Sequence, residues 1–356
     1  MGLKIDVIVP CYKAHKVLPR LMGSIISQVI VEDLEVTLVN DGDEKDYSEI
    51  VEKFSPFVKI KEVKMKKNMG PGTARRFGYE HTSNPLVTWI DADDTFSGAF
   101  SLKLLRQELL ESPLNAICIG TFVEEHNEIQ PKPIYVPHQN DTIWMFGKMY
   151  RRDFLDMHEI KMNDTRANED NGFNMLCKLM CDDYHQIKFI PDVVYYWHSN
   201  ENSITRINNC QYSYDQSFVG YTENMIWAFR EAEKRNPFNG AILYEKVATL
   251  MNLYEYFIET EVRDPRFIKQ NWGYCKVYYK EIYREVKDKI PEKAFIEAYN
   301  NVIRNSYMGD KLKGIIPSMS IYEFLRRLEE DYLADLQAQE AEDKELVGTA
   351  KGSKNK

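Results

Sequence analysis

The sequence predicts an α/β fold, with a mostly parallel sheet and flanking helices, followed by an α-helical C-terminal region. Short β-branched apolar runs alternate four times with segments of helical period, which indicates parallel strands joined by crossover helices. Polar or acidic residues follow the ends of these runs. Past residue 207, apolar side chains recur at helical spacing instead. With 356 residues, the chain can hold one large domain or two modest ones.

The alternation is clearest before residue 91. We expect strands over 5–10, 34–39, 58–63 and 86–90, with helices over 16–29, 47–54 and 71–81 between them. Pro71 stands in the first turn of the third helix, where its missing N–H costs nothing. Because each helix connects two strands, the strands should run parallel.

The remaining elements are less regular. We expect a helix over 100–111, a strand over 116–122, edge strands or a loop over 124–138, a helix near 169–180 and short strands at 188–191 and 193–197. Later apolar stripes such as Phe218 to Phe229 predict a core of helices. We therefore divide the chain into a domain over 1–206, a helical region over 207–336 and a flexible polar tail over 337–356.

Composition restricts the class of protein. A net charge of −9 argues against a large nucleic-acid-binding surface. The six cysteines have no metal-site or disulfide spacing, so we expect reduced, buried thiols and a cytoplasmic location. The sequence shows no signal peptide and no apolar run long enough to span a membrane, which predicts a soluble protein.

Three carboxylates follow the strand over 86–90: Asp91, Asp93 and Asp94. In open α/β sheets, side chains at the carboxyl ends of strands line the ligand site. Such closely spaced carboxylates repel one another unless a hard divalent cation joins them. Asp-X-Asp spacing lets such a cation be shared with a substrate diphosphate, while the alternative is a solvated acidic turn.

Two other readings of this region are weaker. Haloacid-dehalogenase-like phosphatases also carry Asp-X-Asp-X-Thr after a strand, and their covalent intermediate would form on Asp91; the later acidic pair they need is incomplete here. A dinucleotide-binding loop starting at Gly70 would need glycine where Arg75 stands.

Six motifs occur in order along the chain. They lie at 8–12, 39–42, 68–75, 91–94, 168–170 and 196–206. Together they resemble the family 2 glycosyltransferases, which have a GT-A fold and invert the configuration at the anomeric carbon. The resemblance covers roughly residues 4–206 and implies a Rossmann-like nucleotide-binding domain.

The resemblance implies a nucleotide-sugar site at the carboxyl edge of the sheet. Its nucleotide-binding residues would be Pro10, Tyr12, Asp41, Arg75, Asp91 and Ala92. Asp41 would contact the base and Arg75 the diphosphate. Arg75 also lies one turn into a helix whose positive end can face phosphate oxygens.

The implied metal ligands are Asp93, His198 and Asp91, and Asp91 could instead bind the ribose. Carboxylates fit Mn²⁺ or Mg²⁺, and an imidazole ligand favours Mn²⁺. Asp94 and Arg206 rank lower, as sugar or phosphate contacts. A structural role for His198 remains the alternative.

Asp170, in the Asn168–Asn171 segment, is the implied catalytic base. Inverting transfer needs a carboxylate that takes the proton of the acceptor hydroxyl. Alternatively, Asp170 only complements the dipole of a helix that starts there. Trp144, Tyr150 and Trp197 could stack on a sugar ring or belong to the core.

The sequence thus predicts a metal-dependent inverting glycosyltransferase that uses a nucleoside-diphosphate sugar, with a UDP-sugar as the expected donor. A glycan, a protein or a small hydroxyl compound would be the acceptor, and a hydroxymethylated DNA base ranks lower. The helical region would shape the acceptor site or form a homo-oligomer contact. A phosphatase and a catalytically idle sugar-nucleotide-binding module are the alternatives.

Overall fold

The computed structural model describes residues 2–127, 132–165, 167–181, 184–200, 217–308 and 312–352. The chain divides into two compact units, residues 1–239 and 240–356. The predicted boundary after residue 206, together with Arg206, falls in 201–216, outside the described residues.

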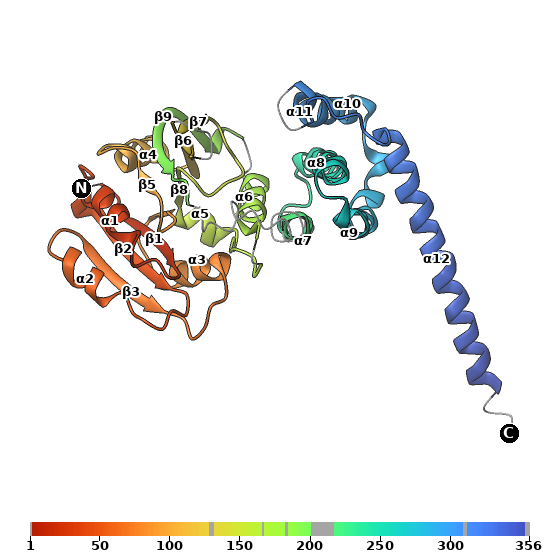
Figure 1. Cartoon of the computed structure of the whole chain (residues 1–356), viewed down its shortest axis with the longest axis horizontal. Coiled ribbons are helices and arrows are strands. Elements are labelled where there is room, and N and C mark those ends of the chain that lie inside the picture. The colour runs from red at the N-terminus through yellow and green to blue at the C-terminus, as the bar shows by residue number, and fades with distance from the viewer. Residues whose placement is uncertain are drawn as a thin grey trace. The chain divides into compact units, whose positions relative to one another are not determined.

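One sheet forms the centre of the first unit (Figure 1). Its strands in the described residues are β1 (Ile5–Cys11), β2 (Leu34–Asn40), β3 (Lys59–Lys64), β4 (Leu86–Trp89), β5 (Thr95–Phe96), β6 (Ile117–His126), β7 (Ile134–His138), β8 (Lys148–Arg151) and β9 (Ile187–Trp197). They lie in the order β3-β2-β1-β4-β8-β6-β9-β5, and β7 pairs with β6.

The first four strands are parallel neighbours. Ile5 in β1 lies opposite Leu34 in β2 and opposite Leu86 in β4, while β8 runs antiparallel to β4 and β6. The carboxyl ends of β1, β2 and β4 therefore meet at one edge, and the acidic turn 91–94 follows there. The predicted α/β fold with a mostly parallel sheet is confirmed.

The helices of this unit connect the strands or follow them. They are α1 (Leu18–Ile26), α2 (Ser48–Phe54), α3 (Pro71–Glu80), α4 (Ser101–Glu111), α5 (Arg152–Met157), α6 (Glu169–Met180) and α7 (Ser217–Arg235). Helix α7 packs on α6: a Cβ on Gly172 in α6 would lie 2.9 Å from Cβ of Asn224 in α7.

The structure differs from the predicted strands at β9, at β8 and at β5, and β5 was not predicted. Residues 187–197 form one strand, β9, where the sequence predicted two short strands over 188–191 and 193–197. The ladder between β6 and β9 is irregular between Ile119 and Thr121, so the missing N–H of Pro191 falls where pairing is interrupted. Strand β8 was not predicted, because its four residues are too few to show alternation.

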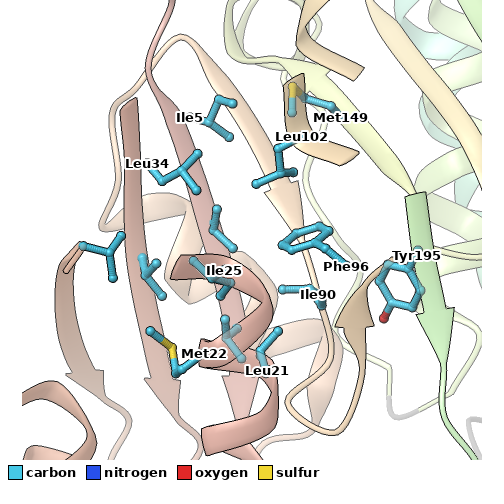
Figure 2. Close-up of a cluster of buried hydrophobic side chains, with 14 of the residues drawn as sticks. Ile5, Leu21, Met22, Ile25, Leu34, Ile90, Phe96, Leu102, Met149 and Tyr195 are labelled. Atoms are coloured by element: carbon cyan, nitrogen blue, oxygen red, sulfur yellow. The ribbon is translucent and has the colours of Figure 1, made fainter. Parts of the chain in front are cut away.

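The main core lies between α1, α4 and the sheet (Figure 2). Leu21, Met22 and Ile25 of α1 are fully buried, as are Ile5 and Leu102. Strand β1 is buried on both faces, as expected for a parallel strand covered by helices. This packing fixes the strand ends that carry the site.

The second unit is helical where it is described. Its helices are α8 (Ala241–Arg263), α9 (Ile268–Glu281), α10 (Glu292–Tyr299), α11 (Asn305–Met308) and α12 (Ile321–Gly352). Helix α12 includes residues 337–352, for which the sequence predicted a flexible tail. The Ala, Glu, Gln and Lys residues there are polar but are strong helix formers. None of the helices in the described ranges is both long and apolar enough to cross a membrane.

Candidate active site

Asp41 follows β2 and is buried with 3% of its surface exposed. Its two carboxylate oxygens accept hydrogen bonds from the backbone N–H groups of Met69, at 2.8 Å, and Gly70, at 2.9 Å. Asp41 therefore holds the loop that leads into α3. A contact with a nucleotide base stays a prediction.

Pro10 and Tyr12 lie at the end of β1. Pro10 pairs in register with Val39 of β2, and the Tyr12 side chain is 49% exposed. The Lys13 ammonium lies 5.1 Å from the centre of the Tyr12 ring. The chain bends sharply here, because Lys13 has a φ of 53° and its N–H donates to Asp43 at 2.6 Å. Tyr12 thus offers an open aromatic ring at the carboxyl edge of the sheet.

In the acidic turn, Asp94 is the buried member, with 1% exposed. It accepts a 2.6 Å hydrogen bond from the Tyr195 hydroxyl and a 2.9 Å bond from the backbone N–H of His198. Burial and the neighbouring charge of Asp93 raise the pKa of Asp94 well above its usual value. Asp94 therefore holds β9 against the turn, and Ala92 is buried beside it.

Asp93 and His198 are two of the predicted metal ligands near this turn. Asp93 accepts a 2.7 Å hydrogen bond from the Asn200 side chain, and burial raises its pKa. The Nε2 atom of His198 lies 2.8 Å from the Thr95 hydroxyl, and its Nδ1 lies 3.3 Å from Glu125. Burial, followed by the nearby charge of Arg20, lowers the pKa of His198 and favours neutral imidazole.

The described residues hold no preformed cluster of three metal-ligating side chains. The donor chemistry nevertheless fits a divalent ion. Glu125 takes the Nδ1–H of His198, as carboxylates do behind metal-bound histidines, which leaves the Nε2 lone pair as the potential ligand. That atom now faces the Thr95 hydroxyl, which a metal would have to replace.

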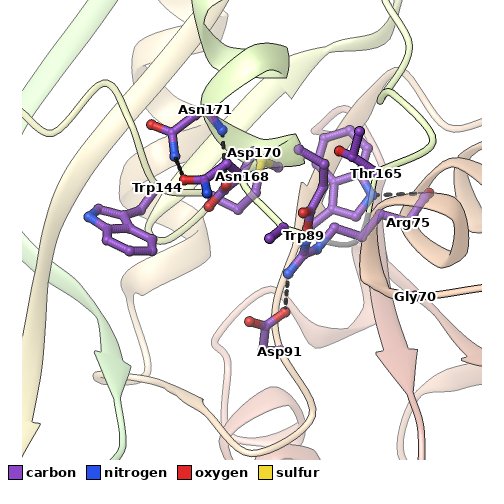
Figure 3. Close-up of polar contacts among 12 residues, drawn as sticks. Gly70, Arg75, Trp89, Asp91, Trp144, Thr165, Asn168, Asp170 and Asn171 are labelled. Carbon is purple, nitrogen blue, oxygen red and sulfur yellow. Dashed lines mark hydrogen bonds and ion pairs between the residues drawn. The ribbon is translucent and has the colours of Figure 1, made fainter. Parts of the chain in front are cut away.

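Arg75 connects the acidic turn to helix α6 (Figure 3). Its side chain is buried, with Nη2 lying 2.6 Å from Asp91 and Nη1 lying 2.5 Å from Glu169. Although burial opposes the charge, the two carboxylates raise the pKa of Arg75 above its ordinary value. Its Nε atom is buried and has no partner among the described residues.

Helix α6 begins with two adjacent acids in different surroundings. Glu169 is 4% exposed and pairs with Arg75. A Cβ on Gly72 would lie 2.6 Å from Cγ of Glu169, so the first turn of α3 packs directly on this side chain. Asp170 is half-buried and accepts a 2.9 Å hydrogen bond from the backbone N–H of Asn171.

Burial and the charge of Glu169 raise the pKa of Asp170 to about 7, although Arg75 lowers it. A carboxylate with this pKa is suited to accept a proton near neutral pH. Asn168, just before the helix, adopts a left-handed conformation with φ 58°, and its side chain accepts a 2.8 Å hydrogen bond from Asn171. This turn delivers both acids at the start of the helix.

The aromatic candidates differ in burial. Tyr150 is fully buried and donates a 2.6 Å hydrogen bond to Asn174, so it belongs to the core. Trp144 and Trp197 are half-buried, with ring centres 5.4 Å apart, at the margin of the core cluster. Only these two keep part of a ring surface exposed.

Sequence reasoning assigned no role to several residues near the acidic turn, among them Thr95, Glu125 and Arg20. Thr95 and Glu125 contact the imidazole of His198, and Arg20 donates a hydrogen bond to the backbone oxygen of Asp93. Only Arg20 had a detectable signal, because Arg20, Ser24 and Gln28 recur every four residues in a segment that the sequence predicts as a helix.

Comparison with known proteins agrees with this geometry. Residues 6–166 match the model of glycosyl transferase family 2. The uncharacterized glycosyltransferase EpsJ of Bacillus subtilis is 24% identical over 222 residues, covering 57% of this chain and 63% of that protein. The poly(ribitol-phosphate) beta-N-acetylglucosaminyltransferase TarS of Staphylococcus aureus is 30% identical over 206 residues, covering 55% of this chain and 35% of that protein. The chain thus spans less than two thirds of the length of these curated relatives.

Solved structures share the fold. The crystal structure of S. aureus TarS 1–349 in complex with UDP-GlcNAc has a TM-score of 0.66 at 18% identity, covering 86% of this chain and 92% of that one. The mannosyltransferase PcManGT from Pyrobaculum calidifontis, in complex with GDP-Man and Mn²⁺, has a TM-score of 0.50 at 12% identity, covering 94% and 88%. The family match, the relatives and the shared fold confirm the predicted resemblance: residues 6–166 carry a glycosyl transferase family 2 domain with the GT-A fold.

Proposed function

We propose that this protein is a glycosyltransferase that moves a sugar from a nucleoside-diphosphate sugar to an acceptor hydroxyl, with inversion at the anomeric carbon. The carrying observation is the division of roles between Glu169 and Asp170. Glu169 neutralises the buried Arg75, whereas Asp170 keeps a carboxylate with a pKa of about 7 beside it. An inverting transfer needs one such base next to a nucleotide site.

The nucleotide would lie at the carboxyl ends of β1, β2 and β4. Tyr12 would offer a ring to the base, and Pro10, Asp41 and Ala92 would shape the crevice. The TarS complexes with UDP and UDP-GlcNAc support a UDP-sugar as the donor. The GDP-Man complex of PcManGT supports nucleotide-sugar binding by this fold in general.

Asp93 and the Nε2 atom of His198 would hold a Mn²⁺ or Mg²⁺ ion, with Asp91 as a further ligand. When bound, the ion would neutralise charge on the departing diphosphate. Arg75 would keep Asp91 in place for the ion or the ribose, and its unpaired Nε could donate to the donor substrate.

Asp170 would accept the proton of the acceptor hydroxyl while that oxygen attacks the anomeric carbon. The bond between the anomeric carbon and the diphosphate oxygen breaks in the same step, and the diphosphate leaves on the opposite face of the sugar. A glycan, a protein or a small hydroxyl compound would supply the hydroxyl. The phosphatase alternative is disfavoured, because Asp91 is held by Arg75 and the family match points to transfer.

A binding experiment tests the donor and metal assignments. UDP at one hundred times its dissociation constant should add about 2.7 kcal/mol to the free energy of unfolding. We expect this gain with Mn²⁺ and not in EDTA. Asp93→Asn should abolish it, whereas the exposed control Asp192→Asn should retain it. Thermal unfolding measures all four conditions, and an equal UDP effect in EDTA would remove Asp93 and His198 as metal ligands.

A further inference from the structure

Three polar side chains recur at four-residue spacing along α1 and the turn that follows it. Arg20 and Ser24 lie four residues apart in α1 and therefore on one side of the helix, and Gln28 follows two residues after the helix ends. Each contacts the chain that begins at the acidic turn. Gln28 donates to the carbonyl of Gly98 at 2.8 Å, and Ser24 accepts from the N–H of Phe96 at 3.2 Å.

Arg20 forms the third contact, because its Nη2 donates to the carbonyl oxygen of Asp93. The three side chains differ in exposure: Gln28 is buried, Ser24 is half-buried and Arg20 is exposed. Gln28 and Ser24 thus fix the backbone of α1 against residues 96–98. Arg20 projects from this fixed backbone at the open end of the row, beside the carboxylate of Asp93.

A nucleoside diphosphate bound here would bring several negative charges to an edge that already carries Asp91 and Asp93. Arg75 is poorly placed to compensate for them, since both of its terminal nitrogens are bound to carboxylates. Turning Arg75 toward a phosphate would leave Glu169 buried and unpaired, at a large cost. The Arg20 guanidinium gives up only one carbonyl contact, at an exposed position.

We infer that Arg20 binds the diphosphate of the donor, exchanging the Asp93 carbonyl for phosphate oxygens, and that Arg75 serves to hold Asp91 and Glu169. The inference rests on the proposed function. A guanidinium suits this task because its planar fork of N–H groups matches two phosphate oxygens. The ligand class is a nucleoside diphosphate. Because Arg20 contacts only the diphosphate, the corresponding uncharged nucleoside should bind independently of Arg20.

Calorimetric titration with UDP and with uridine, at saturating Mn²⁺, tests this inference. Arg20→Gln should weaken UDP binding by about tenfold, as expected for one lost charge-assisted hydrogen bond. Uridine affinity should not change. Arg20→Lys should recover part of the UDP affinity, since it restores the charge without the fork.

The matched control is Arg76→Gln, which changes the net charge equally. Arg76 lies in α3 and pairs with Asp164 at 2.6 Å, so its loss should leave UDP affinity intact. Wild-type UDP affinity in Arg20→Gln would overturn the inference, as would an equal loss for uridine. Recovery of Arg20→Gln by tenfold more Mn²⁺ would also overturn it, by showing that Arg20 acts through the metal. A wild-type protein that binds no UDP would instead contradict the proposed function.

Discussion

The two acidic regions of the first unit treat their carboxylates differently. In the turn over 91–94, Asp93 and Asp94 are held by polar side chains and backbone groups, such as Asn200 on Asp93, whereas Asp91 pairs with Arg75. At the start of α6, a buried arginine pairs with Glu169 and leaves Asp170 with a backbone N–H. The first region groups carboxylates that a cation can bind. The second leaves the Asp170 carboxylate available as a proton acceptor.

The comparison teaches that adjacent acids acquire separate roles through their partners. Glu169 and Asp170 are neighbours in sequence, yet only Glu169 faces Arg75. Asp91 and Asp94 likewise differ, because Asp91 pairs with Arg75 while Asp94 accepts from Tyr195. Arg75 links the two regions, so changes in one should be measurable in the other.

The largest expected effect belongs to Asp170→Asn. This change removes the proton acceptor but keeps the size of the side chain, so turnover should fall by about 10²–10⁴-fold. UDP affinity should stay the same, because the donor contacts lie at the other region. Turnover and UDP titration on the same preparation measure both quantities.

If Asp170 only complements the helix dipole, a different result follows. Asp170→Asn would then cost about 0.3–1 kcal/mol of stability and leave turnover nearly intact. Near-normal turnover would remove Asp170 from the mechanism and make Glu169 the next candidate for the base.

The pH dependence should be the second largest effect. Since the pKa of Asp170 is raised to about 7, the carboxylate is protonated below that pH, and turnover should fall about tenfold per pH unit there. Above that pH, turnover should level off. The free energy of unfolding should change in the opposite direction. The folded state holds the proton of Asp170 more tightly than the unfolded chain does. The stability that this proton contributes is therefore lost as the pH rises from about 4 to 7.

Rate profiles and unfolding curves between pH 5 and 9, measured on the wild-type protein and on Asp170→Asn, separate the rise of turnover with pH from the fall of stability with pH. Deletion of the carboxylate should remove the pH dependence of the residual rate. A wild-type rate that is flat from pH 5 to 8 would contradict the base assignment.

Glu169→Gln should have the smallest effect on turnover and tests the link between the regions. Loss of the negative neighbour lowers the pKa of Asp170, so the midpoint of the rate profile should move to lower pH. Arg75 loses a buried partner, which should destabilise the protein by about 3–5 kcal/mol.

The neighbouring pair Arg76–Asp164 supplies the control, because its side chains are 28% and 56% exposed. Asp164→Asn should cost about 1 kcal/mol or less and should leave the pH midpoint in place. Equal losses of stability at the two pairs, measured by denaturant unfolding, would show that Arg75 does not depend on Glu169.

The parallel half of the fold was predictable, because buried strands such as β1 and β2 are rich in β-branched and other apolar residues and each precedes a helix. Strand β9 was harder, since Pro191 locally resembles a break and only the irregular pairing with β6 shows why it is tolerated. The helical character of residues 337–352 was missed because polarity was given more weight than helix propensity.

For the site, order along the chain singled out candidate residues such as Arg75, Asp91 and Asp170, but not how their side chains pair. Arg75 and Glu169 are far apart in sequence, and no local pattern indicates that one neutralises the other. The contacts of His198 with Thr95 and Glu125 likewise depend on strand pairing. The metal and base assignments themselves stay predictions.

The row of hydrogen bonds between α1 and residues 93–98 has a consequence for protein engineering. Backbone groups at Phe96 and Gly98 are bonded by the side chains of Ser24 in α1 and of Gln28 just after it, so a new acidic turn grafted from another transferase would arrive without its partners. An unpaired buried N–H or carbonyl costs about 1–3 kcal/mol. Residues 18–28 and 91–98 therefore depend on each other, and a graft that replaces the acidic turn should replace both segments together.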